Sequence, residues 1–213
     1  MKLYTFQRNP VWETIQKEGF YHPFNLFEKD KFLKEQCKED WGFSHSYVWL
    51  KEQMLKRNVA HINHNEHLIW AWHKWYGAKS KPDKRYSAVF SFFPEPFVMM
   101  ELDIDPNRIL LSDYDAWHWV LNYNYLVAEG EDDAFLAKHN YYKERPLADA
   151  EADAEIRKSW ENVFDLDKSR EIVQSTPDHQ CVQATFFEIF KKDVKKVHYF
   201  ENNKCIRIED TSS

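Results

Sequence analysis

Three of the polar residues in a largely apolar stretch near the end of the chain are the first candidates for chemistry. The stretch from Gln180 to Phe190 is rich in β-branched and aromatic residues and lacks glycine and proline, which predicts a buried or half-buried strand. Gln183 and Thr185 are two residues apart, so their side chains leave the same face of that strand. Glu188 stands an odd number of residues further on and points to the opposite face unless a bulge intervenes.

The second group of candidates is aromatic. Residues 68–76 read Leu-Ile-Trp-Ala-Trp-His-Lys-Trp-Tyr and predict a strand that presents Trp70 and Trp72 on one face. Two indoles on one face can line a cleft for a flat heterocycle. They can equally belong to the core, where tryptophan is usually found.

Three histidines, His61, His64 and His67, precede this strand at intervals of three. On a helical turn two of them could hold a metal, but zinc needs three or four protein ligands with support from an outer layer of side chains. The Asn-rich context indicates a loop. The sequence therefore predicts solvent-exposed histidines and no metal site.

The composition excludes several classes of protein. In 213 residues, 43% hydrophobic and 17% aromatic content rules out a disordered chain and fits a single domain over residues 1–213. The net charge of −6 argues against nonspecific coating of nucleic acid, although it allows a local basic groove. No run approaches the ~20 apolar residues of a membrane helix, no signal-peptide pattern opens the chain, and three widely spaced cysteines fit a reducing compartment. We expect a cytoplasmic protein with no membrane partner.

The motifs of several enzyme classes are missing. The four glycines are scattered, so neither a G-x-G-x-x-G dinucleotide turn nor a P-loop occurs, and G-x-S-x-G and H-E-x-x-H are absent. Rossmann enzymes and Walker-type NTPases are excluded.

The elements that must position the candidates form an α+β pattern. Strands are predicted at 2–7, 68–76, 97–104, 109–111, 180–190, 197–200 and 205–208, and helices at 10–19, 25–38, 44–56, 114–121 and 153–164. Residues 128–153 form an irregular acidic excursion with short helices. Because strands and helices do not alternate regularly, we expect several helices packed on a mixed or largely antiparallel sheet.

Blocks along nearly the whole sequence resemble a bacterial family known chiefly as a domain of unknown function (DUF3841-like). The matching blocks are residues 3–7 with Trp12, residues 69–72, residues 110–113 with Trp117, His118, Leu121 and Asn122, residues 159–160 with Phe164 and Asp165, and residues 183–185.

The chain also resembles, more weakly, ADP-ribosyltransferases of the toxin type that modifies DNA bases. Leu3-Tyr4-Thr5-Phe6-Gln7, followed by a helix ending at Gly19, is similar to their first strand and helix, and Gln183-Ala184-Thr185 is similar to their late Gln-Ala-Glu strand. This resemblance implies antiparallel or mixed sheets that form a cleft, with NAD as co-substrate. Thr5 stands at the histidine position of that pattern, and Thr185 stands at the position of the catalytic glutamate.

The resemblance implies two groups of site residues. The catalytic group is Gln183, Thr185 and Glu188. A threonine cannot act as a base near neutral pH, so Glu188 supplies the missing carboxylate if the strand end or a bulge turns it inward. Otherwise Glu188 is an ordinary exposed residue of the strand. The NAD-binding group is Tyr4, Thr5, Gln7, Trp70 and Trp72.

The function implied is mono-ADP-ribosyl transfer to a macromolecule, by a bacterial toxin or phage-defence effector. The acceptor would be a nucleic acid, RNA or DNA, and the partner an antitoxin protein. Two alternatives stay open: a non-catalytic binding module on the same fold, and an enzyme that processes NAD or RNA ends.

Overall fold

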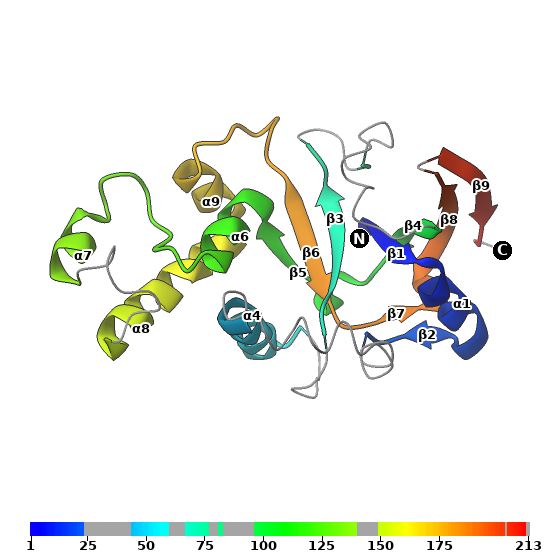
Figure 1. Ribbon diagram of the computed structural model, residues 1–213, viewed down its shortest axis with the longest axis horizontal. Coiled ribbons are helices and arrows are strands. Elements are labelled where there is room, and N and C mark those ends of the chain that lie inside the picture. The colour runs from blue at the N-terminus through cyan, green and yellow to red at the C-terminus, as the bar shows by residue number, and fades with distance from the viewer. Residues whose placement is uncertain are drawn as a thin grey trace.

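A computed structural model describes residues 1–23, 44–59, 67–76, 81–82, 96–139, 149–202 and 204–211. Within these residues the fold is α+β, as predicted. A seven-stranded antiparallel sheet runs in the order β5-β6-β3-β1-β4-β8-β9, and a two-stranded ribbon pairs β2 with β7 (Figure 1). The strands are β1 Lys2–Arg8, β2 Phe20–Tyr21, β3 Ile69–Lys74, β4 Phe97–Asp103, β5 Leu110–Asp113, β6 Val182–Phe186, β7 Ile189–Phe190, β8 Val194–Glu201 and β9 Lys204–Asp210. The predicted helix at 25–38 lies outside the described residues.

The first helix, α1 (Asn9–Glu18), follows the predicted pattern. Proline stands in its first turn, where a missing N–H costs nothing, and Gly19 ends the helix with φ of 84°, a conformation that favours glycine. Its buried residues are Val11, Trp12 and Ile15. They pack against one face of the sheet, where Val98, Met100 and Leu102 of β4 alternate inward.

The other described helices gather beyond the β5 edge of the sheet, on the side away from α1 (Figure 1). They are α4 Ser44–Lys56, α6 Tyr114–Leu121, α7 Asp133–Lys138, α8 Ala150–Ser159 and α9 Leu166–Ile172, together with the short 3₁₀ helix η2 Trp160–Phe164. Two further 3₁₀ helices lie elsewhere: η1 Pro106–Arg108 connects β4 to β5, and η3 Lys191–Asp193 follows β7 beside the end of α1, where the Lys191 N–H donates to the Gly19 carbonyl at 2.8 Å. None of the helices in the described part of the chain is both long and apolar enough to cross a membrane.

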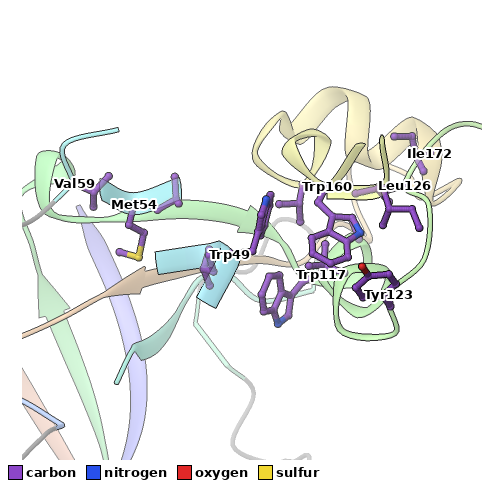
Figure 2. Packing of buried hydrophobic residues seen from close by; sticks show 14 of the residues in the cluster. Trp49, Met54, Val59, Trp117, Tyr123, Leu126, Trp160 and Ile172 are labelled. Atoms are coloured by element: carbon purple, nitrogen blue, oxygen red, sulfur yellow. The ribbon is translucent and has the colours of Figure 1, made fainter. Parts of the chain in front are cut away.

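An aromatic cluster holds these helices together (Figure 2). The Trp160 ring lies 5.4 Å from Trp49 and 5.2 Å from Tyr123, both edge to face, and its indole N–H donates to the Asn124 carbonyl at 2.8 Å. This geometry satisfies the one polar atom of a fully buried indole.

The predicted helices at 44–56 and 114–121 are confirmed with these boundaries. The helix predicted at 153–164 is α8, which already begins at Ala150 and tightens into η2 at Trp160. The acidic excursion at 128–153 therefore contains α7 and the first turn of α8, while residues 140–148 lie outside the described part. Helix α9 was not predicted, although Asp165 caps it by accepting from the Lys168 N–H at 3.0 Å.

The stretch 180–190 is divided between two sheets. β6 ends at Phe186, and after Phe187 and Glu188 the chain continues as β7, which pairs with β2 in the ribbon. The prediction of a single strand is therefore wrong. The break at Phe187 and Glu188 takes the chain from the large sheet into the ribbon.

The large sheet is split between β1 and β3. β1 pairs with β4 from Lys2 to Arg8, whereas only Tyr4 and Trp72 are in register between β1 and β3. The Thr5 hydroxyl donates to the Trp70 carbonyl at 2.8 Å, so a side chain bridges the two strands where their backbone pairing ends. Beyond this bond the strands separate.

Candidate functional site

A cleft of about 430 Å³ lies at this split. One wall comes from Phe6 and Gln7 on β1, and another from Tyr21 and Pro23 at the end of β2. The remaining lining residues are His67, Leu68, Ile69, Trp70, Ala71, Trp72 and Gln183. Because β1 and β3 pair only at Tyr4 and Trp72, the space between their unpaired ends forms a concavity.

Strand register explains why Trp72 and Gln183 meet in the cleft. Trp72 is opposite Gln183, and Trp70 is opposite Thr185. Residues directly opposite one another in an antiparallel pair share a face of the sheet. Trp70, Trp72, Gln183 and Thr185 therefore leave the same face, as predicted for each strand separately.

Four of the eight predicted site residues line the cleft: Gln7, Trp70, Trp72 and Gln183. All four are half-buried, so part of each side chain is accessible. The indoles are held from behind, because Trp70 packs on Trp117 at 5.3 Å and Trp72 packs on Tyr114 at 5.0 Å. The site therefore has fixed aromatic walls with two carboxamides at its edge.

The other four predicted residues are not among those that line the cleft. Tyr4, Thr5 and Thr185 are at most 2% exposed. The Thr5 hydroxyl, besides its bond to Trp70, accepts from the Gln7 amide at 2.9 Å, and the Thr185 hydroxyl donates to the Leu110 carbonyl at 3.4 Å. Both threonine hydroxyls are thus engaged inside the protein, and Thr5 orients Gln7.

Glu188 is not among the residues that line the cleft, but it contacts a neighbour of two that do. Its carboxylate is 3.4 Å from the ring of His22, which stands between Tyr21 and Pro23, and 3.8 Å from the Arg108 guanidinium. Arg108 binds Asp193 more closely, at 2.9 Å and 3.1 Å. The sequence allowed for a bulge before Glu188, and the strand is indeed interrupted at Phe187 and Glu188. This interruption turns Glu188 toward His22 and Arg108.

His67 is a cleft residue that the sequence reasoning missed. It is half-buried, so the prediction of solvent exposure is wrong for it, and His61 and His64 lie outside the described residues. Burial lowers the pKa of His67, and the nearby charge of Lys51 on α4 lowers it further. Burial raises the pKa of Tyr21, another lining residue, to about 12. The signal in the sequence was the position of His67 directly before the Trp-rich strand.

A second polar group, Glu101 and its partners, was also missed. Glu101 in the middle of β4 accepts from the His198 ring at 2.7 Å and forms an ion pair with Lys81, and both Glu101 and His198 are buried. Burial alone would raise the pKa of Glu101, but hydrogen bonds from Lys81 and His198 outweigh it, so the pKa lies below its usual range. The position of Glu101 between the apolar residues Met100 and Leu102 was the available signal.

Within the described ranges, no group of three or more His, Cys, Asp or Glu side chains is arranged to hold a metal ion. The cleft offers carboxamides, indoles, an imidazole and a phenol. These groups suit a planar organic ligand that carries an amide or hydroxyl groups, because aromatic faces stack on flat rings while a few polar groups fix orientation.

Comparison with known proteins identifies one family. The model of a family described as a domain of unknown function (DUF3841) matches residues 2–195. No curated protein and no solved structure matches the chain. The resemblance to ADP-ribosyltransferases is not among these matches and stays a prediction.

Proposed function

The chain belongs to the DUF3841 family, whose description names no activity, and we propose from its cleft that it is an NAD-dependent mono-ADP-ribosyltransferase acting on a macromolecule. The observation that carries the proposal is the convergence of Gln7, Trp70, Trp72 and Gln183 on one cleft. Gln7 lies on β1 and Gln183 on β6, the two strands that the resemblance picks out, and the two tryptophans lie on β3 between them.

The cleft fits the nicotinamide end of NAD in its chemistry. The nicotinamide ring is flat and stacks on an indole face of Trp70 or Trp72. Its carboxamide both donates and accepts, so it pairs with the side-chain amide of Gln7 or Gln183. The bond between Gln7 and Thr5 holds one of these amides in place before the ligand arrives, which reduces the entropy lost on binding.

Transfer requires stabilisation of positive charge at C1′ of the nicotinamide ribose as nicotinamide leaves. Among the described lining residues no carboxylate is present, so the carbonyl oxygen of Gln183 is the acceptor we assign to the ribose hydroxyl. Orientation of the dinucleotide and preorganised dipoles then supply most of the rate enhancement.

The acceptor is proposed to be a base of RNA or DNA, and the biological role a toxin or phage-defence effector with an antitoxin partner. This part rests on the resemblance alone. In such a complex, a single-stranded or flipped base would stack on the aromatic side chains of the cleft.

A non-catalytic binding module is the second candidate. It is favoured by the absence of a carboxylate from the described lining and by the burial of Thr5 and Thr185. Such a module binds NAD or a nucleobase in the same cleft and leaves the glycosidic bond intact.

Incubation of the protein with NAD⁺ labelled in the adenylate group, in parallel with RNA, DNA and cell lysate, separates the two candidates. Transferase activity labels one of these polymers and releases an equal amount of nicotinamide. Binding without label or nicotinamide supports the module, and the absence of all three signals overturns both candidates.

A pair of variants assigns the result to the cleft. Gln183→Ala is expected to lower label transfer at least tenfold, because it removes the amide that contacts the ligand. Gln16→Ala, on the exposed face of α1, is the matched control and retains full activity. Equal activity of the two variants would remove Gln183 from the site.

A further inference from the structure

We propose that His67 is the general base of the cleft, and that it takes the proton of the acceptor as the acceptor attacks C1′ of NAD⁺. The inference rests on the proposed function and adds a catalytic residue to it. It is drawn from the geometry of the cleft, which His67 lines together with Trp70 from a position two residues before β3 begins.

The reaction itself demands a proton acceptor. The bond between C1′ and the nicotinamide nitrogen breaks, its electron pair leaves with neutral nicotinamide, and a new bond forms between C1′ and an O–H or N–H atom of the acceptor. The acceptor loses one proton in this step, so a group near C1′ must bind that proton.

The described lining residues offer two titratable groups for this role, Tyr21 and His67. The pKa of Tyr21 is raised to about 12, so Tyr21 is a neutral phenol at neutral pH. A neutral phenol donates a hydrogen bond but does not act as a general base. The glutamine amides are not bases. His67 is therefore the group in this lining that can accept a proton.

The surroundings of His67 keep it ready to act as a base. His67 is half-buried. Burial lowers the pKa of His67, and the positive charge of the Lys51 ammonium group on α4, which would repel a protonated His67, lowers it further. Tyr21 of β2 lines the same cleft. Burial and Lys51 both favour the neutral imidazole, which is the form that accepts a proton.

His67→Ala tests the role, with His73→Ala as the matched control. His73 lies on β3, the strand that follows His67, and is likewise half-buried, but it is not among the residues that line the cleft, and its ring lies 3.4 Å from the Lys2 carbonyl. We expect His67→Ala to lower single-turnover label transfer by about 10²-fold or more, with the dissociation constant of NAD⁺ unchanged within about twofold, as expected for an effect on the chemical step. Added imidazole should restore part of the rate, and His73→Ala should match the wild type.

The pH profile provides a second readout. Wild-type transfer should fall on the acid side as His67 becomes protonated, and this acid limb should disappear in His67→Ala and in His67→Gln, which preserves side-chain bulk if the alanine variant folds poorly. If both variants transfer label at the wild-type rate and with the wild-type pH profile, His67 is not the general base, while the proposed function stands. A parallel loss of NAD⁺ affinity would make it a binding residue instead. A wild-type protein that binds NAD⁺ but transfers no label would overturn the proposed function together with this inference.

Discussion

At the scale of single residues, the structure separates polar side chains that face the cleft from those that hold the protein together. Gln183 and Thr185 were equivalent in the sequence, yet Gln183 is half-buried in the cleft lining and Thr185 is fully buried with its hydroxyl on the Leu110 carbonyl. Residue type and strand periodicity predict the shared face of the sheet. They do not predict which part of that face is covered.

The buried Glu101 is a test of electrostatics at this scale. Because its pKa is lower in the folded protein than the ordinary value of 4.5, its contribution to stability is complete above that value and is lost as the pH falls through the folded pKa. Glu101→Gln should lower the free energy of unfolding by about 2 kcal/mol at pH 7, as for other hydrogen bonds to charged groups.

Urea denaturation at several pH values measures this effect. The difference between wild type and Glu101→Gln should shrink as the pH falls below 4.5, whereas Glu13→Gln, at an exposed position on α1, should resemble the wild type throughout. A difference that stays constant down to acid pH would contradict an ionised Glu101 in the folded protein.

Thr5 provides the second residue-scale test, because its buried hydroxyl bridges β1 and β3. Thr5→Val keeps the shape and leaves the Trp70 carbonyl without this donor, so we expect a loss of about 1–3 kcal/mol in the free energy of unfolding. Thr14→Val, near the surface of α1, should change it by less than about 0.5 kcal/mol. If Thr5→Val folds with wild-type stability but no longer binds NAD⁺, Thr5 is a ligand-binding residue and not a structural bridge.

At the scale of elements, β5, α6 and the start of β6 are joined through one carboxylate. Asp113 caps α6 by accepting from the Asp115 and Ala116 N–H groups, each at 3.0 Å, and its other oxygen accepts from the buried Gln180 amide at 2.8 Å. This bond gives Gln180, the first polar residue of the stretch 180–190, a structural role.

Asp113→Ala should therefore cost more than the loss of a helix cap. We expect about 2–4 kcal/mol, from about 1 kcal/mol for the cap and the remainder for the buried Gln180 N–H that loses its acceptor, while the same amide keeps its bond to the Leu166 carbonyl. Asp165→Ala removes only the cap of α9 and should cost about 1 kcal/mol. Equal losses in chemical denaturation would show that the bond to Gln180 contributes nothing.

Most elements could be predicted from the sequence because their signals are local. Proline and Gly19 delimit α1, Asp113 starts α6, and alternation marks β1 and β4. The division of residues 180–190 between two sheets could not be predicted, because it depends on the pairing of β7 with β2, far away in the chain.

The cleft was predictable only in part for the same reason. The sequence indicated Gln183 and the two tryptophans, each from the pattern of its own strand. The cleft itself arises where β1 and β3 stop pairing beyond Tyr4 and Trp72. His67 lines the cleft because it precedes the part of β3 that has separated from β1. The separation of the two strands has no local signal, and the only local signal for His67 was its position before the Trp-rich strand.

At the scale of the whole molecule, three hydrophobic clusters contribute residues to the cleft. Ile69 and Ala71 belong to the core between the sheet and α1, and Phe6 and Trp72 belong to a smaller cluster around Phe97. Trp70 packs through Trp117 against the aromatic cluster of Figure 2. The position of the cleft walls thus depends on all three clusters.

The aromatic cluster should carry much of the stability. Trp160→Ala removes a fully buried indole and should cost about 3–5 kcal/mol in the free energy of unfolding. Trp119→Ala, at a side chain that is 37% exposed on α6, should cost less than half as much. Similar losses for the two variants would argue against a tightly packed helical core.

The central claim is that the cleft at the split of the sheet binds NAD⁺, and isothermal titration of the protein with NAD⁺ tests it most directly. We predict saturable binding by the wild type, and at least tenfold weaker binding by a Gln7→Ala/Gln183→Ala double variant that remains folded by circular dichroism. Absence of binding at millimolar NAD⁺, or equal affinity of the two proteins, would contradict the claim.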